Sequence, residues 1–70
     1  MAREALIHRV NPYLLHGEQY YEIVYSYTNE PDTLRQSRVA HDYIYPSPQE
    51  GDHVTIDAIL SVITEIKKKE

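Results

Sequence analysis

The chain has 70 residues and a mass of 8.2 kDa, which suffices for one small domain, residues 1–70, and excludes a second one. It contains no cysteine, so neither a disulfide nor a thiolate metal site can support the core. Seven basic residues against eleven acidic ones give a net charge of −4, which makes nucleic acid an unfavourable partner. No apolar run approaches the length of a membrane span, and residues 1–4 lack the apolar stretch of a secretory signal. We therefore expect a cytoplasmic protein with no membrane contact.

Tyrosine is the only aromatic residue of this sequence apart from histidine. There are seven Tyr, and there is no Phe or Trp. Tyrosine packs its ring while its hydroxyl stays hydrated or hydrogen-bonded, so a core that depends on it is thin and partly wet. This composition favours a small barrel or an open sheet over a thick sandwich.

The first predicted strand is short and covers Ala5 to Val10. Apolar residues fall on both of its faces, so its alternation is mixed. Pro12 cannot donate to a ladder, and the strand should end there or lie at a sheet edge. Residues 13–15 would then lead into the first turn.

Residues 19–28 show the clearest alternation in the chain and predict a strand. Pro31 stands between turn-forming polar residues, which predicts a turn at 29–32. Residues 34–45 follow as the antiparallel partner strand of a β-hairpin, with a bulge expected near residues 40–41.

The C-terminal segment fits two structures. A helix over residues 55–69 would place five apolar residues on one face, and its lysine-rich end would suit the helix dipole. The abundance of β-branched residues instead favours two strands, 53–59 and 62–68, with a bend near Leu60 and Ser61. We predict the two strands. The fold would then be all-β, a small antiparallel open barrel of about five strands, SH3-like or OB-like. The alternative is an α+β meander with a C-terminal helix.

The order of these segments resembles a known family. A tyrosine-rich strand over residues 20–27 leads through a polar hairpin to the run Gly51-Asp52-His53-Val54-Thr55-Ile56. This pattern is similar to that of a broad bacterial family of small β domains of unknown function. The resemblance covers about residues 5–58 and implies a small β domain. That family has no assigned chemistry, so the resemblance implies no functional residue.

Catalytic and metal-binding motifs are missing from the sequence. The four histidines have no metal-ligand spacing, and the adjacent pairs His41-Asp42 and Asp52-His53 would point to opposite faces of a strand. No serine stands in a glycine-rich elbow, and neither glycine belongs to a phosphate loop. We expect no enzyme activity, no catalytic residue, no metal site and no cofactor.

The tyrosines are the one feature that suggests a binding site. The candidates on the two hairpin strands are Tyr21, Tyr25, Tyr27, Tyr43 and Tyr45. They form either the buried face of the sheet or a flat docking surface for a peptide, a second copy of the chain or single-stranded nucleic acid. The residues expected to be mostly buried are Ile23, Tyr25, Val39, Ile56 and Val62.

These observations favour a non-catalytic binding or assembly module that self-associates or docks a protein or peptide through a tyrosine-rich sheet face. A small core without disulfide or metal gains support from a partner, and unpaired strand edges invite one, so we expect a homodimer. The alternative function is a nucleic-acid-binding accessory protein with a small barrel, which the net charge of −4 opposes.

Overall fold

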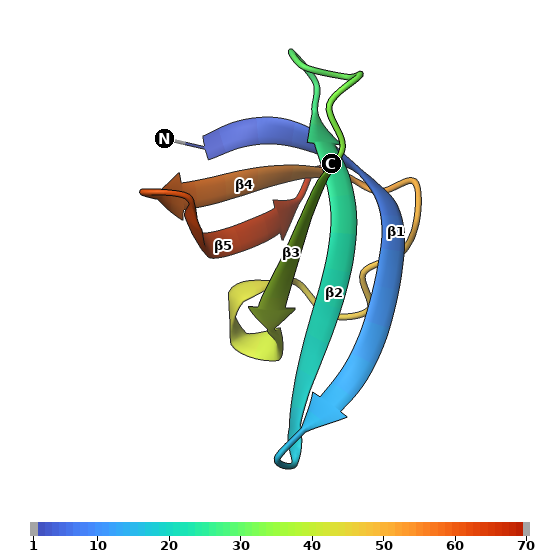
Figure 1. The fold of residues 1–70 in the computed structure, drawn as a ribbon, viewed down its shortest axis with the longest axis vertical. Coiled ribbons are helices and arrows are strands. Elements are labelled where there is room, and N and C mark those ends of the chain that lie inside the picture. The colour runs from blue at the N-terminus through green and yellow to red at the C-terminus, as the bar shows by residue number, and fades with distance from the viewer. Residues whose placement is uncertain (1, 70) are drawn as a thin grey trace.

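The structure, a computed structural model, describes residues 2–69 and consists of one antiparallel five-stranded sheet. The strands are β1 (Ala2–Leu15), β2 (Glu18–Tyr27), β3 (Arg35–Ala40), β4 (His53–Ile59) and β5 (Val62–Lys68). One turn of 3-10 helix, η1 (His41–Tyr43), follows β3 (Figure 1). The all-β prediction is confirmed, as are the two C-terminal strands. The alternative helix over residues 55–69 is wrong.

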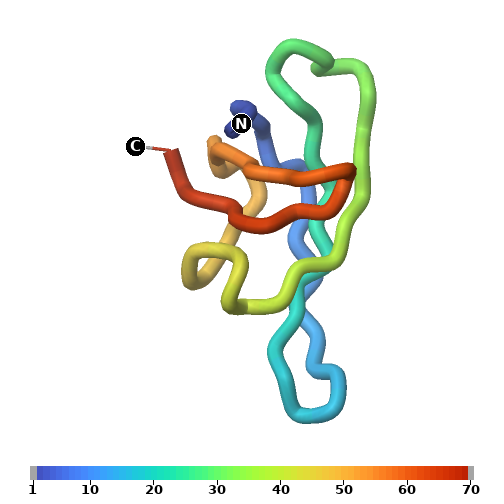
Figure 2. The backbone as a smooth tube through the Cα atoms, turned by 90° about the vertical axis from the view of Figure 1, so that its left-hand side faces the viewer, coloured from blue at the N-terminus to red at the C-terminus, as the bar shows by residue number. Residues whose placement is uncertain are grey.

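The sheet curls into a barrel that stays open. The strand order is β3-β2-β1-β4-β5, so β3 and β5 are the two edges. The curl brings these edges toward each other (Figures 1 and 2). Ile44, just after η1, forms a single parallel bridge to Ile66 of β5, and no ladder extends from it among residues 2–69.

The β1–β2 hairpin protrudes from this barrel (Figure 1). Strand β4 pairs with residues 2–6 of β1 only, whereas β2 pairs with β1 as far as Leu15. The predicted end of the first strand at Val10 is therefore wrong, because β1 continues through Pro12 and includes residues 13–15, which were expected only to lead into the turn. The expected edge position is confirmed, since Pro12 lies where β1 has a neighbour on one side only, a place where sheets tolerate proline.

An extra residue in β1 explains why apolar residues fall on both faces of the predicted strand. Ile7 pairs with Tyr25 and Arg9 with Val24, so His8 is a bulge. The bulge shifts the alternation by one residue, and apolar side chains of both parities reach the core. His8 itself covers the buried Ser26, with its Nε2 2.8 Å from the serine Oγ.

The predicted burial of Val62 is wrong, because β5 contains a second bulge. Asp57 pairs with Glu65 but Ala58 pairs with Ile63, which leaves Thr64 as the extra residue. The Thr64 hydroxyl donates to the Asp57 carbonyl at 3.2 Å. Because of this shift Ile63 and Ile66 both face inward, and Val62 is 65% exposed.

The hairpin of β2 and β3 is antiparallel as predicted, but β3 is shorter than the predicted strand 34–45. The chain leaves the sheet at Ala40 and turns through η1. This turn buries the Ile44 side chain and bridges it to β5, which a straight continuation of β3 would not do.

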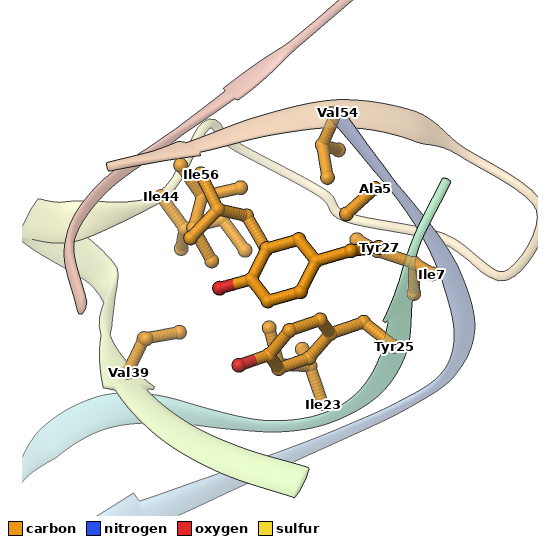
Figure 3. Close-up of a cluster of buried hydrophobic side chains, with 10 residues drawn as sticks. Ala5, Ile7, Ile23, Tyr25, Tyr27, Val39, Ile44, Val54 and Ile56 are labelled. Atoms are coloured by element: carbon orange, nitrogen blue, oxygen red, sulfur yellow. The ribbon is translucent and has the colours of Figure 1, made fainter. Parts of the chain in front are cut away.

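Aliphatic side chains from all five strands, with Ile44 after η1 and two tyrosine rings, fill the barrel (Figure 3). The buried apolar residues are Ala5, Ile7, Ile23, Tyr25, Tyr27, Val39, Ile44, Val54, Ile56 and Ile66. The predicted burial of Ile23, Tyr25, Val39 and Ile56 is confirmed.

Candidate functional site

The structure divides the five candidate tyrosines between the core and the surface. Tyr25 and Tyr27 are only 6% and 7% exposed, and their rings meet edge to face with centroids 5.5 Å apart (Figure 3). Tyr21 and Tyr45 are half-buried and pack against the core, whereas Tyr43 in η1 is 51% exposed. Of the five candidates, the accessible ones are thus Tyr21, Tyr43 and Tyr45.

These three tyrosines line two adjoining hollows beside η1. One, of about 560 Å³, lies between the protruding hairpin and the chain after η1. Its apolar and aromatic lining comprises Leu14, Tyr21, Ile44, Tyr45 and Pro46. The other, of about 460 Å³, lies toward β5 and includes Tyr43. Ile44 and Tyr45 line both hollows, so we call the two together the tyrosine groove.

The ring of Tyr45 is fixed by the loop that follows it. Its hydroxyl donates to Asp52 Oδ2 at 2.6 Å, and the same oxygen accepts from the backbone N–H of Gln49 at 3.0 Å. The hydrogen bond from Tyr45 holds the pKa of Asp52 below its usual value, while burial raises the pKa of Tyr45. A side chain held in this way loses little conformational entropy when a ligand packs on it.

Charges of both signs rim the groove. Lys67 and Lys68 lie on the β5 side together with Glu65, and Lys67 pairs with Glu65 at 3.8 Å. Asp42 adds a further carboxylate beside η1, and Glu18 adds another on the hairpin. A groove with an apolar floor, two lysines and three carboxylates suits an uncharged or mixed-charge polypeptide better than a polyanion.

Leu14 belongs to the site although sequence reasoning does not predict it, because the first strand is expected to end before residue 13 and residues 13–15 to lead into a turn. The structure places the turn at His16 and Gly17, with φ of 52° and 80°. Two successive residues with positive φ are typical of a two-residue hairpin turn. Gly17 after a polar residue, between two β-rich runs, is the signal that could have located this turn and extended the strand to Leu14.

Among residues 2–69 no three His, Asp or Glu side chains gather closely enough to hold a metal ion. His41 and Asp42 do not point apart as predicted: their Nδ1 and Oδ1 atoms are 3.1 Å apart, because both lie in η1 rather than in a strand. In the same part of the chain, no helix has the length and apolar character needed to cross a bilayer.

Comparison with protein-family models, with curated proteins and with solved structures finds no match to this chain. The resemblance to a bacterial family of small β domains stays a prediction.

Proposed function

We propose that this chain is a non-catalytic module that docks an extended protein segment in the tyrosine groove. The observation that carries the proposal is the convergence of Tyr21, Tyr43 and Tyr45 on one groove, with the Tyr45 ring held by Asp52.

The groove chemistry fits an extended peptide. Aromatic-lined grooves bind extended segments, proline-rich ones above all, because such segments lose little entropy on binding. Tyrosine rings offer flat apolar area for side chains, and the hydroxyls of Tyr21 and Tyr43 can donate to the free carbonyls of an extended backbone, whereas the Tyr45 hydroxyl donates to Asp52. Tyr43 is the most accessible of the three rings and is the one we expect a ligand to cover most.

Selection from a library of random 12-residue peptides tests this proposal. Peptides that bind the wild-type chain should lose at least about tenfold in affinity with Tyr43→Ala, the loss typical of a buried aromatic contact at an interface. The matched control is Tyr13→Ala, because Tyr13 stacks on Tyr20 at 5.7 Å and does not line the tyrosine groove. Equal losses in both variants, or no loss in Tyr43→Ala, would contradict the proposal.

Self-association is the second candidate function, and strand edges favour it. Beyond the segment paired with β4, one edge of β1 has no neighbouring strand among residues 2–69, and neither has the outer edge of β3. Leu14 and Leu15 stand exposed at the end of the free β1 edge. A net charge of −4 opposes pairing only weakly, since the Debye length is about 8 Å at physiological salt.

Sedimentation equilibrium over a hundredfold range of concentration tests self-association. We expect a dimer that forms at micromolar concentration. A constant mass near 8.2 kDa would contradict it and leave peptide docking untouched. A cytoplasmic location belongs to the same proposal, and microscopy of a fluorescently tagged chain in cells checks it.

A further inference from the structure

A cavity of about 240 Å³ lies at the other end of the barrel, beside the β4–β5 turn. The residues that line it are Arg3, Tyr25, Tyr27, Arg35, Ile56, Ala58, Ser61 and Ile63. We call it the arginine pocket. It shares no residue with the tyrosine groove.

Two guanidinium groups meet at the rim of this pocket. The Arg3 Cζ atom lies 3.7 Å from the centroid of the Tyr27 ring, and the Arg35 Cζ atom lies 5.3 Å from it. The Nη2 atoms of Arg3 and Arg35 donate to the same oxygen, Glu30 Oε1, at 3.4 Å and 3.2 Å. Arg3 Nη2 also donates to Asn29 Oδ1 at 2.9 Å. The turn between β2 and β3 thus holds both cations over one aromatic ring.

The two guanidiniums retain unused hydrogen-bonding capacity. Every bond they make within residues 2–69 uses Nη2, which leaves the Nε–H and Nη1–H groups of both Arg3 and Arg35 without a protein acceptor there. Glu30 balances one of the two positive charges. A planar fork of donors with a remaining positive charge matches a carboxylate, which can accept from both guanidiniums.

The lining of the pocket is mixed, with more polar than apolar surface. Tyr25, Tyr27 and Ser61 bring hydroxyl groups to it, and Ile56, Ala58 and Ile63 form the apolar part of its wall. A bare inorganic anion would leave this apolar part uncovered. A small apolar group that carries a carboxylate would cover it and place its charge at the two arginines.

We propose that the arginine pocket binds a carboxylate attached to a small apolar group, through Arg3 and Arg35. Two sources carry this chemistry: the C-terminal residue of a peptide and a free short-chain carboxylic acid. The volume is below the 300–1,000 Å³ or so typical of drug-sized ligand sites, so one apolar side chain or a short alkyl chain is the size that fits.

NMR titration of the full chain with hexanoate tests this proposal, with the arginine Nε–Hε signals as the readout. We expect saturable shifts at Arg3 and Arg35, and a loss of at least about tenfold in affinity with Arg35→Gln, because charge-assisted hydrogen bonds to a carboxylate are lost. The matched control is Arg38→Gln on the same strand, since Arg38 pairs with Glu22 and does not line the pocket. Glu30→Gln should tighten hexanoate binding several-fold, because it removes the competing carboxylate.

An uncharged ligand and an inorganic anion test whether the pocket needs both the carboxylate and the apolar group. Hexanol and inorganic phosphate should each bind much more weakly than hexanoate. Equal binding of hexanol, equal binding of phosphate, or an unchanged affinity in Arg35→Gln would overturn the proposal. Acetyl-Ala-Leu with a free C-terminus distinguishes the two sources. If this dipeptide binds more tightly than hexanoate, and its C-terminal amide does not bind, the pocket takes the C-terminal residue of a peptide. If the dipeptide binds more weakly than hexanoate, the pocket takes a free acid. None of these results bears on the tyrosine groove.

Discussion

Leu60 and Ser61 form the two-residue turn between β4 and β5, with φ of 51° and 70°. The left-handed region costs most residues free energy, and such turns favour Asn-Gly. The Leu60 side chain is 93% exposed, so it recovers little of this cost by packing. The flanking ladder therefore holds the turn in a conformation that its own residues disfavour.

Replacing this turn should stabilise the protein. We expect Leu60→Asn combined with Ser61→Gly to raise the free energy of unfolding by about 1 kcal/mol, because Asn and Gly adopt positive φ at lower cost. Urea unfolding measures the change. A lower stability would show that the exposed Leu60 side chain makes a stabilising contact.

Tyr25 gives the protein a pH dependence at the alkaline end. Burial, with the neighbouring Tyr27 as a second cause, raises the pKa of Tyr25 to about 12. The pKa of tyrosine in an unfolded chain is about 10, which is lower than that of Tyr25 in the folded state, so folding favours the neutral form. This contribution to stability is complete below about pH 10 and is lost as the pH rises toward 12. We expect the wild-type chain to lose more stability in this window than Tyr25→Phe. Parallel stability curves from urea unfolding at each pH would refute this assignment.

At the scale of the elements, the alternation of side chains in the sequence predicted the buried face of β2 correctly, but not the buried faces of β1 and β5. The alternation of β2 has no interruption, so its inward face at Ile23 and Tyr25 could be predicted. The bulges at His8 and Thr64 each reverse the alternation within one strand. A local pattern does not show which residue is extra, because cross-strand pairing selects it. The alternation therefore predicts the wrong face for Val62.

Two similar truncations, one in the core and one beside the β5 bulge, should have very different effects on stability. Ile23→Ala should cost about 2–4 kcal/mol, because Ile23 is fully buried and its truncation leaves a cavity. Val62→Ala should change stability by less than about 0.5 kcal/mol, because the bulge at Thr64 turns Val62 to solvent. Thermal or urea unfolding of both variants checks the pair. A comparable loss in the two would place Val62 in the core and contradict the β4–β5 register.

The tyrosine groove depends on η1, and this explains why the sequence predicted only part of the site. A straight strand to Tyr45 would have placed Tyr43 and Tyr45 on one flat face with Tyr21. In the structure η1 redirects the chain, and the bond from Tyr45 to Asp52 then closes the following loop. These contacts join segments with no shared periodicity, so the residue types were predictable and their arrangement was not.

At the scale of the molecule, the open barrel carries a different candidate binding site at each of two places. The edge between η1 and the protruding hairpin carries the tyrosine groove, and the end beside the β4–β5 turn carries the arginine pocket. Composition predicted that tyrosine supplies the aromatic rings of the core, because the sequence has no Phe or Trp. Composition did not predict the pocket, because Arg3 and Arg35 lie 32 positions apart in the sequence and are brought together by Glu30 and the Tyr27 ring.

The most direct test of peptide docking is a map of backbone amide chemical shifts on the full chain, titrated with a peptide selected from the random library. The groove predicts that the largest changes cluster at residues 41–47, at Tyr21 and at Leu14 of the hairpin. Changes along the free edge of β1 or at the arginine pocket, with residues 41–47 unaffected, would contradict the assignment of the tyrosine groove as the docking site.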